Sequence, residues 1–330
     1  MAVEPWAMRL EQGGADLRRT DLRLAELKGS EVLVQVDACG VCRTDLHILD
    51  GELAGSLPII PGHEIVGRIV ARGPNVRDFQ TGERVGIPWL AWTCGRCEQC
   101  RAGRENLCED AAFTGFTRDG GFASHCVADA RYCLRLPERY DDVSAAPLLC
   151  AGLIGYRAYR AVGDAQHIGI YGFGAAAHLI AQIALAQGRT VSAFVRPGDA
   201  GGTEFAMSLG CIWAGGSDEA PPKPCDAAII FAPVGALVPR ALRQIRKGGT
   251  VVCAGIHMSD IPSFPYATIW GERSVRSVAN LTRADGLDFM VLAARIPLRV
   301  WTTAVPLAEA NRALSGLRRG DVEGAYVLVP

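Results

Sequence analysis

The sequence predicts an α/β protein in which a β-rich first half precedes a doubly wound parallel sheet. Residues 31–37 and 65–73 alternate apolar and polar side chains in short runs that end at turns, which is typical of antiparallel strands. From residue 167 onward, continuous apolar runs alternate with helical stretches, which is typical of a parallel sheet covered on both faces. The 330 residues exceed what one hydrophobic core usually supports, so two domains are expected.

The elements are expected in a fixed order along the chain. The β-rich domain is placed at residues 1–150 and the parallel-sheet domain at residues 151–281. In the parallel-sheet domain the expected strands are residues 167–171, 190–195, 211–215, 226–232, 250–255 and 274–280, and the expected helices are residues 175–187, 205–209 and 234–245.

The C-terminal segment, residues 282–330, departs from this alternation. It holds two amphipathic stretches, residues 285–294 and 307–316, and a closing apolar run, residues 324–330. A last strand outside the alternation can return to the sheet of the first domain. We therefore expect the parallel-sheet domain to be inserted within the β-rich one.

Charge and hydropathy exclude several classes of protein. The formal net charge is −1, from 34 basic and 35 acidic residues, which provides no basic surface for nucleic acid or for an anionic membrane. No run reaches the roughly 18 apolar residues of a membrane-spanning helix, and the N-terminus lacks a signal-peptide pattern. We expect a cytoplasmic protein without nucleic-acid or membrane partners.

Four of the twelve cysteines form one dense cluster. Four thiolates in a single loop can close a tetrahedral Zn²⁺ site that has no open position and does no chemistry. Free thiols or an iron–sulfur cluster are the alternatives. The predicted structural zinc ligands are Cys94, Cys97, Cys100 and Cys108.

A second set of metal-binding residue types is spread along the chain. Cys42 lies in CGVCRTDLH, His63 and Glu64 lie in PGHEIVG, and Cys150 lies in APLLCAG. Each alone is compatible with an ordinary core position. Together they offer the Cys₂His set of a catalytic zinc, whose fourth position is left for water, substrate or a carboxylate. Such a zinc lowers the pKa of a bound hydroxyl group.

A glycine-rich turn follows the apolar run HIGIY. Gly172 and Gly174 precede Ala175, the first residue of an expected helix, and Ala177 stands where a third glycine is usual. In a dinucleotide-binding fold these small residues let a pyrophosphate approach the amides of the helix N-terminus.

The chain resembles the zinc-containing alcohol dehydrogenases of the medium-chain dehydrogenase/reductase superfamily over nearly its whole length. CGVCRTDLH, PGHEIVG, the four-cysteine loop, LLCAG, GIYGFG and ANLTR occur in that family's order. The resemblance implies a GroES-like catalytic domain and a Rossmann coenzyme domain. It also implies that Cys42, His63 and Cys150 bind the catalytic zinc, with Glu64 as an exchangeable carboxylate.

The same resemblance implies roles for residues around the zinc. Thr44 matches the hydroxyl that bonds the substrate oxygen, and His47 matches the residue that passes the proton to solvent. Asp45 matches the carboxylate that orients the zinc-binding histidine. Arg43 matches a pyrophosphate contact. Trp89 matches a bulky residue that narrows the pocket, which favours small or unhindered primary alcohols.

The cofactor preference is read from two adjacent residues. NAD-binding members carry an acidic residue at the end of the second strand, where this chain has Val195 followed by Arg196. We therefore expect NADP(H) to be favoured over NAD(H). Ala325 replaces a basic residue of the last strand. Relatives are dimers or tetramers, so a homodimer or homotetramer with two zinc ions per subunit is expected.

Other functions stay open at this point. A polyol dehydrogenase shares much of the zinc chemistry, and a redox-sensing relative could keep the fold without catalysis. A zinc-free quinone reductase is disfavoured by the two cysteine sets, and a nucleic-acid-binding zinc ribbon is disfavoured by the neutral charge.

Overall fold

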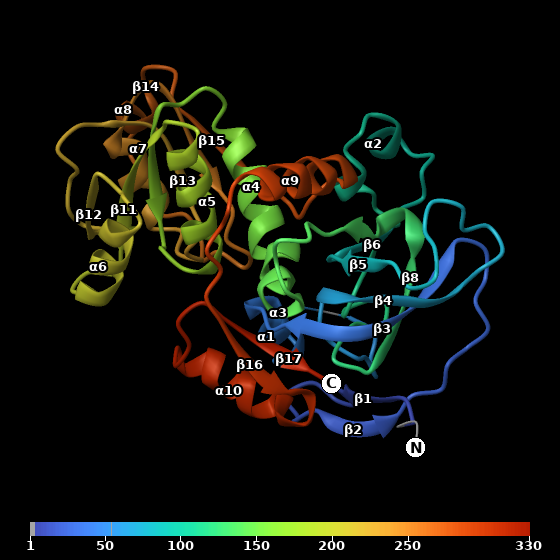
Figure 1. The fold of residues 1–330 in the computed structure, drawn as a ribbon. Helices are drawn as coiled ribbons and strands as arrows, with labels where there is room; N and C mark the ends of the chain where they lie inside the picture. The colour runs from blue at the N-terminus through green and yellow to red at the C-terminus, as the bar shows by residue number, and fades with distance from the viewer. Residues whose placement is uncertain (1–3, 54) are drawn as a thin grey trace. The chain divides into compact units, whose positions relative to one another are not determined.

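The computed structural model describes residues 4–53 and 55–330, and the chain forms two units (Figure 1). The first unit contains Met1–Cys150 and Asn280–Pro330, and the second contains Ala151–Ala279. The second unit is thus inserted between two stretches of the first.

The first unit is built on a seven-stranded sheet. Its order is β16-β17-β3-β4-β5-β9, and β8 also pairs with β3. β3 and β4 are antiparallel, and the buried side chains of β3 alternate along most of its length, as the sequence pattern predicts. The strands of the unit are β1 (Trp6–Arg9), β2 (Arg18–Asp21), β3 (Glu31–Gly40), β4 (Glu64–Arg72), β5 (Arg84–Ile87), β6 (Leu90–Trp92), β7 (Ala112–Phe113), β8 (His125–Asp129), β9 (Leu134–Arg135), β16 (Thr302–Pro306) and β17 (Ala325–Val329).

The C-terminal strand returns to this sheet. β17 pairs antiparallel with the end of β3, where Val327 faces Gly40 and Leu328 faces Cys39 (Figure 1). The helices of the first unit are α1 (Arg43–Leu49), α2 (Glu98–Arg101), α3 (Asp142–Ala145), α9 (Arg283–Arg295) and α10 (Ala310–Arg319).

The second unit is built on a parallel sheet of six strands in the order β12-β11-β10-β13-β14-β15. Every residue of β10 is buried, which is typical of a strand covered on both faces. The strand order changes direction between β10 and β13, and such a point is where doubly wound sheets bind nucleotides. The strands are β10 (His167–Tyr171), β11 (Thr190–Val195), β12 (Trp213–Gly216), β13 (Cys225–Ile230), β14 (Ile245–Cys253) and β15 (Ser274–Ser277).

The helices of the second unit differ from the prediction in four places, because α6 and α7 have shifted bounds and the helices at Ala151–Ala161 and Tyr266–Ile269 were not predicted. α6 begins at Ala200, five residues before its predicted start, and ends at Ser208. It begins early because Asp199 caps it and accepts a hydrogen bond from the Gly202 amide. α7 begins three residues later than predicted. The helices are α4 (Ala151–Ala161), α5 (Ala175–Ala186), α6 (Ala200–Ser208), α7 (Leu237–Gln244) and α8 (Tyr266–Ile269).

Within residues 4–53 and 55–330, no helix combines the length and the apolar character that crossing a bilayer requires. The longest of them, α9, has 13 residues, fewer than the roughly 20 that a bilayer demands.

Candidate active site

The segment that joins β3 to α1 carries several of the predicted site residues. Cys42 is the N-cap of α1 and has an extended backbone, with φ −111° and ψ 160°. The Asp45 carboxylate accepts a hydrogen bond from the Cys42 amide at 2.8 Å, which satisfies a donor that the helix start would leave unpaired. This cap fixes the Cys42 thiol relative to the helix.

Cys42, His63, Glu64 and Cys150 converge in the first unit. One potential ligand atom of each lies within 4.8 Å of the others, and the two sulfur atoms are 3.7 Å apart. His63 and Glu64 are 1% and 3% exposed. Within the part of the chain that the structure describes, His63 Nε2 and Glu64 Oε2 have no hydrogen-bond partner. Buried polar atoms need a partner, and this combination of donors suits Zn²⁺.

The two thiols of this cluster differ in acidity. A hydrogen bond from Cys150 lowers the pKa of the Cys42 thiol well below its usual value, and the pKa of Cys150 is raised correspondingly. Burial raises the pKa of the Glu64 carboxyl well above its ordinary range, and the charge of Cys42 adds to this effect. The pair therefore favours a Cys42 thiolate, which is the form of cysteine that binds a metal.

Asp45 connects two of the segments that form the cluster. Its Oδ1 atom lies 3.3 Å from His63 Nδ1 and accepts a hydrogen bond from the Gly62 amide at 3.2 Å. Its side chain is fully buried. A carboxylate behind one ring nitrogen orients the ring, so that His63 Nε2 faces the cluster.

The loop that carries His63 is held by backbone contacts. The Phe122 amide donates to the Pro61 carbonyl at 2.9 Å, and the Gly121 amide donates to the Gly62 carbonyl at 3.0 Å. Gly62 has φ +95°, a conformation that favours glycine. A Cβ atom at Gly120 would lie 2.1 Å from the Gly62 carbonyl oxygen. Close backbone approach therefore requires glycine at position 120.

The predicted relay residues lie on α1. Thr44 is buried, and its hydroxyl is 3.7 Å from the Cys42 sulfur. His47 is one turn further along the helix, and its Nδ1 atom contacts the carboxylate of Glu52. The left-handed turn at Gly51 (φ +73°) reverses the chain and brings Glu52 back to His47.

Trp89 lies beside the cluster. Its indole ring meets the His63 ring edge-on, with the centroids 5.0 Å apart and an interplanar angle of 80°. Trp89 follows β5 and is half-buried. An aromatic side chain in this position can narrow the space next to a ligand bound at His63.

The four-cysteine loop forms a second cluster in the first unit. The sulfur atoms of Cys94, Cys97, Cys100 and Cys108 lie within 4.8 Å of one another, and Cys94 is 3.6 Å from Cys108. Hydrogen bonds from the amides of Arg96 and Cys97 lower the pKa of Cys94 to about 6. Four sulfur atoms grouped in this way leave no position for a substrate on a tetrahedral ion.

The glycine turn of the second unit joins β10 to α5. Gly172 has φ +82°, and a Cβ atom there would lie 2.7 Å from the Ala232 amide nitrogen. Gly174 is the N-cap of α5, and Ala175 is its first residue. At the end of β11, Val195 is buried and Arg196 is exposed. Arg43 is an exposed residue of the first unit.

Comparisons with known proteins identify the family. Residues 28–138 match the alcohol dehydrogenase GroES-like domain. The chain is 44% identical to the probable alcohol dehydrogenase AdhA of Mycobacterium tuberculosis over 322 residues, which cover 95% of this chain and 92% of that one. The chain belongs to the alcohol dehydrogenase family of medium-chain dehydrogenases.

Solved structures of alcohol dehydrogenases share this fold. The alcohol dehydrogenase of Aeropyrum pernix superimposes with a TM-score of 0.88 at 28% identity, over 98% of this chain and all of that one. A putative zinc-binding dehydrogenase of Sinorhizobium meliloti, bound to NADP, gives a TM-score of 0.88 at 27% identity, over 99% of this chain and 100% of that one. The predictions of the fold class and of an oxidoreductase of this family are confirmed.

Three residues that contact the predicted site residues of this alcohol dehydrogenase were not expected from its sequence. Glu52 contacts His47, and Phe113 and Phe116 stack against Trp89. A signal for Glu52 was present, because Asp50-Gly51 after a short helix predicts a chain reversal. No local pattern predicts the aromatic stack, which joins residues more than 20 positions apart. The roles of the site residues stay predictions.

Proposed function

We propose that this alcohol dehydrogenase is zinc-dependent and interconverts small or unhindered primary alcohols with their aldehydes by hydride transfer to a nicotinamide cofactor. The observation that carries the proposal is the convergence of the half-buried Cys42 and Cys150 with the buried His63 and Glu64, next to the Thr44 hydroxyl. Two thiols and an imidazole would hold the zinc, and Glu64 can occupy or leave the fourth position.

The residues around the zinc ligands orient groups and move a proton. When bound, the zinc supplies a Lewis acid that lowers the pKa of the alcohol hydroxyl. The Thr44 hydroxyl accepts the hydrogen bond of that hydroxyl, and Asp45 keeps His63 in position. His47 takes up the released proton and delivers it to water, because a closed site offers no solvent of its own.

The four-cysteine cluster would hold a second, structural zinc ion. All four of its ligand positions are filled by sulfur, so its contribution is folding free energy rather than chemistry. Two zinc ions per subunit are thus proposed.

The cofactor would bind the second unit at Gly172, Gly174 and Ala175, where the amides that begin α5 can face a pyrophosphate. Arg43 is proposed as a further pyrophosphate contact. NADP(H) is favoured over NAD(H), because Val195 provides no carboxylate for a ribose hydroxyl and the exposed Arg196 can pair with a phosphate. The NADP bound to the Sinorhizobium meliloti relative agrees with this preference.

Metal content and turnover test the zinc assignments together. The purified protein should contain two zinc ions per chain and should oxidise ethanol or benzyl alcohol. Cys42→Ser should remove one ion and abolish turnover while the protein remains folded. Cys94→Ser should remove the other ion and mainly lower the melting temperature. Near-normal turnover of Cys42→Ser with one ion missing would contradict the proposal, and so would a Cys94→Ser variant as heat-stable as the parent.

A substrate panel separates this proposal from a polyol dehydrogenase. We expect higher kcat/KM for primary alcohols than for sorbitol or xylitol, since Trp89 narrows the space beside His63. Size-exclusion chromatography with light scattering tests the proposed homodimer or homotetramer.

Cofactor choice is tested by exchanging two residues. The wild-type protein should show higher kcat/KM with NADPH than with NADH, and Val195→Asp with Arg196→Ser should reverse this preference. A tenfold wild-type preference for NADH, about 1.4 kcal/mol, would show that Arg196 does not bind a phosphate.

A further inference from the structure

Phe113 and Phe116 both stack against Trp89. Their ring centroids lie 5.2 and 5.7 Å from the indole centroid, at interplanar angles of 22° and 14°. The two phenyl centroids are only 6.5 Å apart.

Phe116 is wedged between Trp89 and the chain that follows α1. A Cβ atom built on Gly55 would lie 2.4 Å from Cε2 of Phe116, so the phenyl ring packs directly against the Gly55 backbone. Glycine at position 55 is therefore what makes room for the ring. Stacking on Trp89 and contact with the Gly55 backbone both restrict the Phe116 ring.

A largely apolar hollow of about 170 Å³ borders Phe116, and Trp89 is not among its lining residues. Besides Phe116, its walls include Ile48, Leu53, Leu57 and Ile59. Ile48 directly follows the proposed relay residue His47 on α1. A buried apolar cavity of about 150 Å³ can hold a benzene ring, so this volume suffices for part of an alkyl chain.

We propose that Phe116 is a specificity-determining residue that limits the length of the alcohol, because its ring separates the Trp89 side of the site from this hollow. An alcohol whose carbon chain extends past Trp89 meets the phenyl ring. Replacing that ring with a methyl group would join the two spaces and let the chain extend toward Leu53 and Leu57. This inference rests on the proposed function, since it assigns Trp89 to the substrate pocket.

The test measures kcat/KM for straight-chain primary alcohols from ethanol to octanol. In Phe116→Ala the values for the longer alcohols should rise relative to ethanol by about fourfold for each additional methylene group that enters the hollow, which corresponds to about 0.8 kcal/mol. Phe113→Ala is the matched control, because it also removes a ring that stacks on Trp89 but does not line the hollow. Phe113→Ala should leave the chain-length profile unchanged.

A binding measurement keeps this test separate from the proposed activity. Octanol should raise the melting temperature of Phe116→Ala more than that of the wild-type protein, whether or not either protein turns over alcohol. If Phe116→Ala does not fold, Phe116→Leu takes its place, with a smaller shift in the same direction. The inference is wrong if the folded variant keeps the wild-type profile and gains no octanol stabilisation, or if Phe113→Ala changes the profile equally. If wild type and both variants all fail to turn over alcohol while octanol still stabilises Phe116→Ala, the proposed function is contradicted and the inference about Phe116 is not.

Discussion

The Glu52 carboxylate contacts one ring nitrogen of His47. Glu52 faces Nδ1, and because a carboxylate only accepts hydrogen bonds, Nδ1 carries the proton in the neutral ring. The lone pair then resides on Nε2, where a proton from the relay can be accepted. The Asp50 carboxylate, which ends α1, is bound by Arg318 of α10 through two hydrogen bonds of 2.7 and 2.8 Å. This ion pair anchors the turn that leads to Glu52.

Glu52→Gln should lower kcat by about tenfold or more with little change in KM. A carboxamide can donate to Nδ1 and thereby favour the wrong tautomer of the histidine, while its exposure to water limits the loss. Steady-state kinetics measure the effect, and ¹⁵N NMR of the histidine rings reports the tautomer. Glu309→Gln, which removes an exposed carboxylate paired with Arg312, is the control and should change neither. An unaltered kcat and tautomer in Glu52→Gln would show that Glu52 does not position His47.

The loop that carries His63 packs against Gly120 and requires glycine at that position. A methyl group at Gly120 would lie 2.1 Å from the Gly62 carbonyl oxygen and 2.6 Å from the Pro61 carbonyl oxygen, both of which are backbone atoms. Gly120→Ala should therefore displace the loop, destabilise the protein by about 1–3 kcal/mol and reduce its zinc content. Chemical denaturation and metal analysis measure the two effects. Gly13→Ala is the control: a Cβ atom there would lie no nearer than 3.9 Å to any other heavy atom, so this substitution should be tolerated. Normal zinc content in Gly120→Ala would show that the loop adapts.

Elements were predicted from sequence where one signal dominated. The fully buried strand β10 and the span of α5 follow from hydropathy alone. α6 was placed too late because Gly201 and Gly202 in its first turn are poor helix formers, and the Asp199 cap compensates for them. α1 was not predicted at all, since a cysteine at its N-cap gives little helix signal. The candidate ligands were found because their residue types are rare in combination, whereas their neighbours Glu52 and Phe116 depend on chain reversal and packing.

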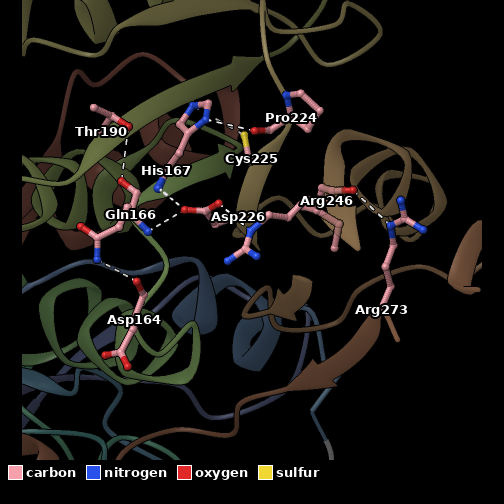
Figure 2. Close-up of polar contacts among 10 residues, drawn as sticks. Asp164, Gln166, His167, Thr190, Pro224, Cys225, Asp226, Arg246 and Arg273 are labelled. Carbon is pink, nitrogen blue, oxygen red and sulfur yellow. Dashed lines mark hydrogen bonds and ion pairs between the residues drawn. The ribbon is translucent and has the colours of Figure 1, made fainter. Parts of the chain in front are cut away.

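At the scale of the whole molecule, the inserted second unit holds the strands of its own sheet together through polar contacts. Figure 2 shows how the strand starts are tied together at one end of it. The Asp226 carboxylate accepts hydrogen bonds from the amides of Gln166 and His167 at 2.8 and 2.9 Å, and it pairs with Arg246 at 2.7 Å. The buried ring of His167 places Nδ1 3.3 Å from the Pro224 carbonyl and Nε2 2.8 Å from the Ser192 hydroxyl. Since a carbonyl only accepts, Nδ1 carries the proton and Nε2 accepts from Ser192.

This buried histidine predicts how the stability of the whole chain responds to acid. Burial lowers the pKa of His167 in the folded state. The unfolded chain, in which the histidine pKa is about 6.5, therefore binds this proton at a higher pH than the folded chain does. The stabilisation is therefore complete above about pH 6.5 and is lost as the pH falls through the folded-state pKa, with a slope of at most about 1.4 kcal/mol per pH unit. Urea denaturation of wild type and His167→Gln between pH 8 and pH 5 measures this loss. The difference between the two proteins should shrink as the pH falls. A constant difference between wild type and His167→Gln over the whole range would mean that His167 does not gain its proton on unfolding.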